Sequence, residues 1–102
     1  MNILKKETGE KNDDGKTRFD LLLPEFEEAV ANVLTLGAEK YGANNWQLVE
    51  NARERYYAAL RRHISAWRKG EIDDEESGKP HLAHAACNLM FLMYFDNMEV
   101  EK

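Results

Sequence analysis

The sequence has few of the features that mark secreted, membrane-bound or DNA-binding proteins. Its one cysteine, Cys87, excludes a disulfide within the chain and favours a reducing compartment, so we expect a cytoplasmic protein. The longest mostly apolar stretch, residues 82–95, contains His84 and Asn88 and is shorter than the roughly 18–20 apolar residues that span a membrane. The first residues lack the apolar segment of a signal peptide. A net charge of −5 argues against direct DNA binding.

Familiar catalytic motifs are also missing. The chain has no Walker-type glycine-rich loop and no dinucleotide-binding fingerprint. It shows no legible Ser–His–Asp arrangement, and no run of alternating apolar and polar residues that would indicate a sheet. With 102 residues, 43% of them hydrophobic and 32% charged, the chain fits one ordinary globular domain.

The domain boundaries follow from the composition. Residues 1–15 are polar and charged, with glycines and aspartates as helix breakers, and predict a flexible N-terminal arm. Residues 16–98 form the predicted single helical domain. Its first stretch, residues 16–23, fits either a short strand or an extended arm.

Two helices are predicted in the first two thirds of the chain. The first begins at Pro24, a residue favoured at the first helical position, and ends near Gly42. The second begins at Asn51, with Glu54 three residues later in the manner of a capping box, and ends near Gly70. The predicted core stripe of the second helix is Tyr56, Ala59, Leu60, His63 and Trp67.

A third helix is predicted from about Pro80 to about Asn97. Its middle is apolar on nearly every side, so it should be buried all round. Three helices can barely surround one of their own number. The predicted fold is therefore all-α, a three-helix bundle completed by homo-oligomerisation.

The third helix also carries a polar stripe. His81, His84 and Asn88 are spaced so that they share one face, and buried polar groups need partners. Hydrogen bonds within the bundle or a metal or ligand would both satisfy them. His63 approaches this stripe if the second and third helices are antiparallel; otherwise it is a core histidine.

Carboxylates and cations offer further candidates. Glu25 and Glu28 share one side of the first helix, where they suit either a metal or the helix dipole. The acidic segment 71–78, which contains Glu76, reads most simply as a solvated loop. A mixture of cations, rings and amides at element ends has the chemistry that a nucleotide needs, namely Lys16, Arg18, Lys40, Tyr41, Asn45 and Trp46. Arg62 adds a cation suited to phosphate.

Four blocks in this order resemble the phage and prophage family of dATP/dGTP diphosphohydrolase N-terminal domains: GKTRFDLLLPEF, LTLGAEKYGANNW, RRHISAWRKGE and DDEESGKPHLAHAACNLMFL. The resemblance covers roughly residues 15–96 and extends distantly to the all-α MazG-type nucleoside triphosphate pyrophosphatases. It implies a nucleotide-binding domain that hydrolyses purine deoxynucleoside triphosphates to monophosphate and pyrophosphate.

The resemblance also implies a set of site residues. The family's matching blocks add Asp74, Ser77 and Trp67 to the residues above. On this reading Glu28, Glu76, His81 and His84 would hold a divalent metal, with His63 and Glu28 catalytic. Nucleotide contacts would come from Lys16, Arg18, Lys40, Tyr41, Asn45, Trp46, Arg62 and Asn88.

Two alternatives stay open. The MazG-type pattern has carboxylates where this chain has His81 and His84, so the ion is Mg²⁺, Mn²⁺ or another ion that accepts histidine, or none is bound. Without a metal, the chain would be a non-catalytic phage protein that sequesters a nucleotide, such as a cyclic signal of host defence. A third possibility is an interaction protein whose histidines are structural.

Overall fold

The computed structural model describes residues 8–100, and side chains as far as residue 98. Within that range the chain forms, in order, η2 (Phe19–Leu21), α1 (Pro24–Tyr41), η3 (Asn45–Leu48), α2 (Ala52–Arg68) and α3 (His81–Val100). The two η elements are short 3₁₀ turns. No strand occurs among the described residues beyond an isolated bridge between Asp73 and Pro80. The predicted all-α fold is thus confirmed.

The ends of α1 lie where the sequence predicts them. Pro24 is the first helical residue, where its missing N–H needs no partner. Gly42 caps the other end with a φ of 96°, a conformation that glycine adopts without strain, and its N–H donates to the Ala38 carbonyl at 2.8 Å.

α2 begins where the sequence predicts, but its first turn is not capped in the predicted way. Asn51 is the N-cap residue, but its backbone is left-handed, with a φ of 56°, and its side chain makes no capping hydrogen bond. The predicted capping box is therefore wrong. A capping side chain bonds to the first turn from an extended backbone, which Asn51 does not have.

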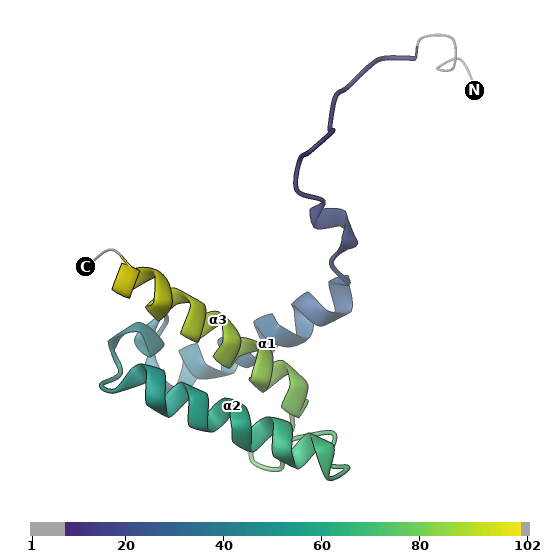
Figure 1. The fold of residues 1–102 in the computed structure, drawn as a ribbon. Helices are drawn as coiled ribbons and strands as arrows, with labels where there is room; N and C mark the ends of the chain where they lie inside the picture. Colours follow the sequence, from purple (N-terminus) through teal and green to yellow (C-terminus); the bar gives the residue numbers. More distant parts are fainter. Residues whose placement is uncertain (1–7, 101–102) are drawn as a thin grey trace.

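α3 is the central helix. It packs mainly against α2 and less extensively against α1, and Figure 1 shows it running beside both. α2 and α3 are antiparallel, because Arg53 at the start of α2 pairs with Asp96 near the end of α3 at 3.0 Å. This pairing places the end of α2 beside the start of α3.

Aromatic side chains hold η3, α2 and α3 together at one end of the bundle. The Trp46 ring stacks on Phe91 with centroids 4.5 Å apart, and Tyr56 contacts Phe91 at 4.7 Å. The Tyr56 hydroxyl also donates to the Trp46 carbonyl at 3.1 Å. These half-buried rings form an aromatic cluster that joins the three elements.

α3 is not buried all round within one chain. Leu89 is 53% exposed and Met93 is 67% exposed, and Leu82 and Met90 are exposed on the same helix. Trp67, predicted in the core, is also exposed. It lies in the last turn of α2, beyond the point where α3 begins opposite His63, so α3 does not cover it. The side chains classed as buried belong only to small or polar residues among those described.

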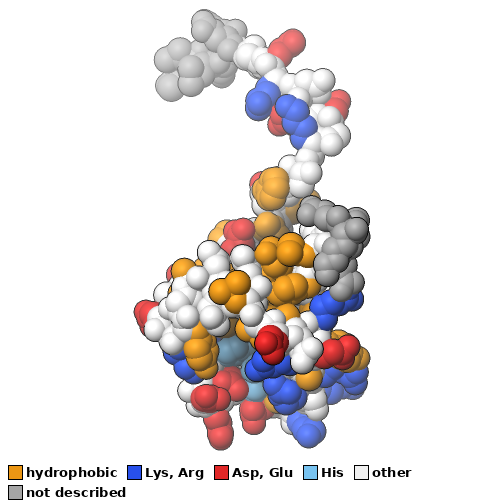
Figure 2. Space-filling view, turned by 90° about the vertical axis from the view of Figure 1, so that its left-hand side faces the viewer, with side chains coloured by type: hydrophobic (Ala, Val, Ile, Leu, Met, Phe, Trp, Pro, Cys, Tyr) orange, Lys and Arg blue, Asp and Glu red, His pale blue; other side chains and the backbone are white. Residues whose placement is uncertain are grey.

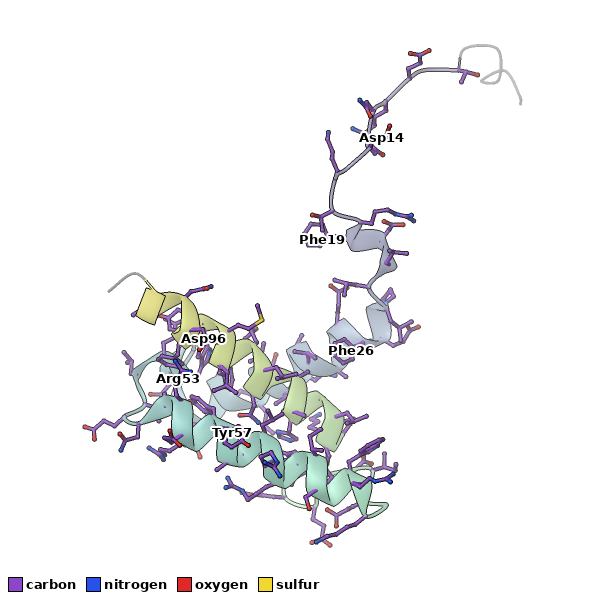
Figure 3. All side chains as sticks on the ribbon, viewed as in Figure 1. Asp14, Phe19, Phe26, Arg53, Tyr57 and Asp96 are labelled. Atoms are coloured by element: carbon purple, nitrogen blue, oxygen red, sulfur yellow. The ribbon has the colours of Figure 1, made fainter. Side chains whose placement is uncertain are left out.

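The segment before α1 leads away from the bundle (Figures 1 and 3). Residues 8–15 form no helix and are exposed, and residues 1–7 of the predicted arm lie outside the described residues. The predicted strand in the stretch 16–23 is absent, and the stretch is an exposed arm in which Phe19–Leu21 forms the η2 turn. No helix in the described range has the length and apolar character to cross a membrane.

Candidate functional site

All three histidines of the chain meet where the end of α2 faces the start of α3. His63 Nδ1 lies 2.8 Å from His81 Nδ1. The rings of His63 and His84 stack with centroids 4.4 Å apart and planes 4° from parallel. The conditional prediction that His63 approaches the histidines of α3 is confirmed by these contacts. In Figure 2, pale blue histidine side chains reach the surface with acidic side chains below them and Lys and Arg to the right.

The acidic segment between α2 and α3 is largely exposed, as the solvated-loop interpretation predicts, but it also contains a folded turn. The Asp74 N–H donates to the Lys79 carbonyl at 2.8 Å, and the Gly78 N–H donates to the Asp74 carbonyl at 2.7 Å. The Asp74 carboxylate accepts the Ser77 N–H at 2.8 Å. These bonds leave Asp74 half-buried beside the histidines. The solvated-loop interpretation did not include this turn, in which a carboxylate bonds its own backbone.

Two further side chains of this turn fix the imidazole orientations. Glu71 Oε1 lies 2.6 Å from His81 Nε2, and Ser77 Oγ lies 2.7 Å from His84 Nε2. An ionised carboxylate only accepts hydrogen bonds, so His81 Nε2 carries a proton and its N–H donates to Glu71 Oε1. In neutral His81, Nδ1 is then an unprotonated nitrogen that faces His63.

Burial and neighbouring groups shift the pKa values of three side chains at this site. Burial lowers the pKa of His63, and the proximity of His84 and His81 lowers it further. Burial also lowers the pKa of His84, although Asp74 opposes this. Burial alone would raise the pKa of Asp74, but its hydrogen bonds with Ser77 and the nearby His84 and His63 lower it overall. These shifts favour the neutral forms of His63 and His84 and the ionised form of Asp74.

One group of side chains at this site could hold a divalent metal. His63, Asp74 and His81 each offer a ligand atom within 4.8 Å of the others. Histidine ligands commonly donate their second N–H to a carboxylate, and Glu71 occupies that position behind His81. Two imidazole nitrogens and a carboxylate oxygen favour Mn²⁺, Zn²⁺ or Fe²⁺ over Mg²⁺. We refer to His63, Asp74 and His81 as the His–Asp cluster.

Of the other predicted metal or catalytic residues, His84 and Glu76 lie near this cluster and Glu28 does not belong to it. His84 stacks on His63, and its Nε2 is 4.0 Å from Asp74 Oδ2. Glu76 is exposed in the turn, close enough to influence the pKa of His84. Glu28 is exposed on α1 and does not belong to the one metal-capable group found among the described residues.

The predicted nucleotide-binding residues are not gathered in one place. Lys16 and Arg18 lie in the segment that leads away from the bundle, where Arg18 pairs with Asp20 at 2.8 Å. Lys40 lies over the Tyr41 ring at 5.4 Å, at the exposed end of α1.

The remaining candidates in that set have different surroundings. Asn45 and Trp46 belong to η3, and the Trp46 ring packs in the aromatic cluster. Arg62 is exposed on α2, next to His63. Asn88 is buried, and its Nδ2 donates to the His84 carbonyl at 3.0 Å.

One contributor has no signal in the sequence. Glu71 is one of several acidic residues in its segment, and only the folded turn places its carboxylate against His81. Asp74 and Ser77 were indicated by the family resemblance. Their spacing, followed by Gly78 with a φ of 72°, also fits a turn in which the aspartate side chain caps its own backbone.

Fold and site together define an all-α protein with a histidine–carboxylate site beside a helical hairpin. Residues 6–102 match the family described as dATP/dGTP diphosphohydrolase, N-terminal, and the chain belongs to that family. It is 43% identical over 90 residues to a dATP/dGTP diphosphohydrolase of Salmonella phage PMBT28. The match covers 88% of this chain but 30% of the phage protein. No solved structure matches, so the distant similarity to MazG-type enzymes stays a prediction.

Proposed function

We propose that this chain binds a purine deoxynucleoside triphosphate and hydrolyses it to the monophosphate and diphosphate. The observation that carries the proposal is the His–Asp cluster, with Glu71 behind it, in a member of this family. The name of the phage relative supports the substrate class. Because the chain corresponds to less than a third of that relative, the proposal assigns the chemistry to this part of the family's longer proteins. Its place would be the cytoplasm of a phage-infected host, where such nucleotides are found.

We further propose that His63, Asp74 and His81 hold a divalent cation of the Mn²⁺ type. Bound there, such an ion would neutralise charge on the phosphates and activate water at neutral pH. Glu71 would keep His81 in the tautomer that presents Nδ1 to the ion. The Ser77 N–H would orient the Asp74 carboxylate, and Ser77 Oγ would hold His84 against the His63 ring. A role of His63 as general base stays a prediction from the sequence.

A direct assay tests the proposal. Purified protein is incubated with each of the four deoxynucleoside triphosphates, with Mg²⁺, with Mn²⁺ or with a chelator, and the nucleotides are analysed after the protein is denatured. We expect monophosphate and diphosphate from the purine nucleotides, with Mn²⁺ at least as effective as Mg²⁺. Recovery of intact nucleotide with the protein would instead support sequestration. If the assay finds neither products nor bound nucleotide, the interaction-protein alternative remains.

The exposed apolar side of α3 supports a second copy of this chain as the binding partner. Leu82, Leu89 and Met93 recur at intervals of seven and four residues, so they lie along one side of the helix, and Met90 adjoins them. No large side chain in the described range is fully buried. So little apolar burial leaves a small domain only marginally stable, and covering this surface would add to its stability. We therefore propose a homodimer, or a larger oligomer, in which this surface is covered.

Replacing Met93 with glutamate is expected to shift the protein from dimer to monomer, because a carboxylate would be buried without a partner. Light scattering coupled to size-exclusion chromatography measures the change. Leu48→Glu is the matched control, because Leu48 is 81% exposed and lies on η3. An unchanged mass for the Met93 variant, or a monomeric unmodified protein, would contradict the proposal.

A further inference from the structure

A cationic groove lies along the last turns of α2, beside the His–Asp cluster. It has a volume of about 850 Å³, and its charged lining residues are Arg61, Arg62, Arg68, Lys69 and Glu71. Four cations and one carboxylate thus line the groove, in a chain whose net charge is −5. The local charge of the groove is therefore opposite to that of the whole molecule.

The cations of the groove are largely uncommitted. Within residues 8–100, Arg62, Arg68 and Lys69 form no ion pair, whereas Arg61 donates to the Tyr57 hydroxyl at 2.7 Å and lies over the Tyr57 ring at 5.6 Å. The single carboxylate, Glu71, is already bonded to His81 Nε2. Arg68 and Lys69 at the helix end also offset the helix dipole, but this does not account for Arg61 and Arg62, two turns earlier.

Glu71 connects the groove to the cluster. It lines the groove and contacts His81, and Arg62, which also lines the groove, directly precedes His63 on α2. A ligand that extends from the groove to the cluster would place several negative charges against arginine forks and an ammonium group. Guanidinium groups bind phosphate oxygens in pairs, and lysine adds a mobile point charge.

We propose that this groove binds the β- and γ-phosphates of the nucleotide, with the α-phosphorus at the His–Asp cluster. The inference rests on the proposed function and specifies how the substrate lies. Water forms a bond to the α-phosphorus, and the bond from that phosphorus to the bridging oxygen breaks. The electron pair leaves with the diphosphate, which takes one proton of the water, while the other proton is released to solvent. The cations of the groove stabilise the charge of the departing diphosphate.

Inorganic tripolyphosphate is the probe for the groove, because it lacks both base and sugar. Titration calorimetry on the full chain is expected to show binding that Lys69→Gln weakens about tenfold and Arg68→Gln at least as much, as the loss of one charge-assisted contact implies. The matched control is Lys11→Gln, because Lys11 is an exposed lysine outside the groove. A deoxynucleoside without phosphates should bind equally to all variants.

The outcomes separate this proposal from the proposed function. No tripolyphosphate binding by the unmodified chain, or equal weakening by Lys11→Gln, would overturn the groove. Loss of binding in the two groove variants, without hydrolysis by any form, would retain the groove and overturn the enzyme. Hydrolysis with an unchanged KM in both groove variants would retain the enzyme and overturn the groove. Binding of a single-stranded oligonucleotide that tripolyphosphate does not displace would also overturn the proposal that the groove binds the β- and γ-phosphates.

Discussion

The Asp74→Asn variant is expected to lose nearly all Mn²⁺ affinity and to slow nucleotide hydrolysis about 100-fold or more. Changing even an indirect partner of a metal ligand costs 10–100-fold in affinity or activity, and Asp74 is a direct ligand in our proposal. The amide has the same shape as the carboxylate, and its oxygen still accepts the Ser77 N–H, so the turn should fold. Only the negative charge is removed. Mn²⁺ binding by calorimetry and diphosphate release at saturating nucleotide measure the two effects.

A carboxylate in the same turn provides the matched control. Glu75 is exposed and belongs to no proposed site, so Glu75→Gln should retain Mn²⁺ affinity and activity. Glu71→Gln should weaken Mn²⁺ binding by an intermediate factor of about 10–100, because it acts through His81. Full Mn²⁺ affinity in folded Asp74→Asn protein, verified by circular dichroism, would contradict the proposed metal site.

The Phe91→Ala variant is expected to have the largest effect on stability, about 3 kcal/mol in the free energy of unfolding. Phe91 stacks on Trp46 and contacts Tyr56, so its removal leaves a cavity at the point where η3, α2 and α3 meet. Loss of a buried phenylalanine typically costs about 3–5 kcal/mol, and Phe91 is only half-buried. For a domain of this size the melting temperature should fall by about 10–25 °C.

Thermal unfolding followed by circular dichroism, at one protein concentration, measures that loss. Phe19→Ala makes the same chemical change at a side chain that is 74% exposed, and it should alter the free energy of unfolding by about 0.5 kcal/mol or less. Equal melting temperatures for the two variants would show that the aromatic cluster does not stabilise the fold as expected.

Prediction from the sequence worked best where a residue's own backbone chemistry decides the outcome. Proline at Pro24 and glycine at Gly42 mark the ends of α1 because of what their backbones permit, so they need no tertiary information. The capping box at Asn51 failed because the connection from η3 imposes a left-handed backbone that local sequence does not specify. Trp67 failed as a core residue because its burial depends on where α3 begins.

The candidate site was predictable only in part. The spacing of His81 and His84 places them together on one helix face, because that follows from helix geometry. The part played by His63 depended on an antiparallel arrangement, which the Arg53–Asp96 pair and the ring contacts now show. The roles of Glu71 and Asp74 depended on the folding of the turn.

The sequence by itself determined that the chain is helical, where α1 begins and ends, and which polar residues share a face of α3. It also determined the family, through the order of its motifs. The tertiary structure alone decided which groups from different elements meet: His63 with His81, Glu71 behind them, and Asp74 beside them. The physical reason is that helical periodicity is set by neighbours a few residues apart, whereas contacts between elements depend on how the helices pack and how the turn between them folds.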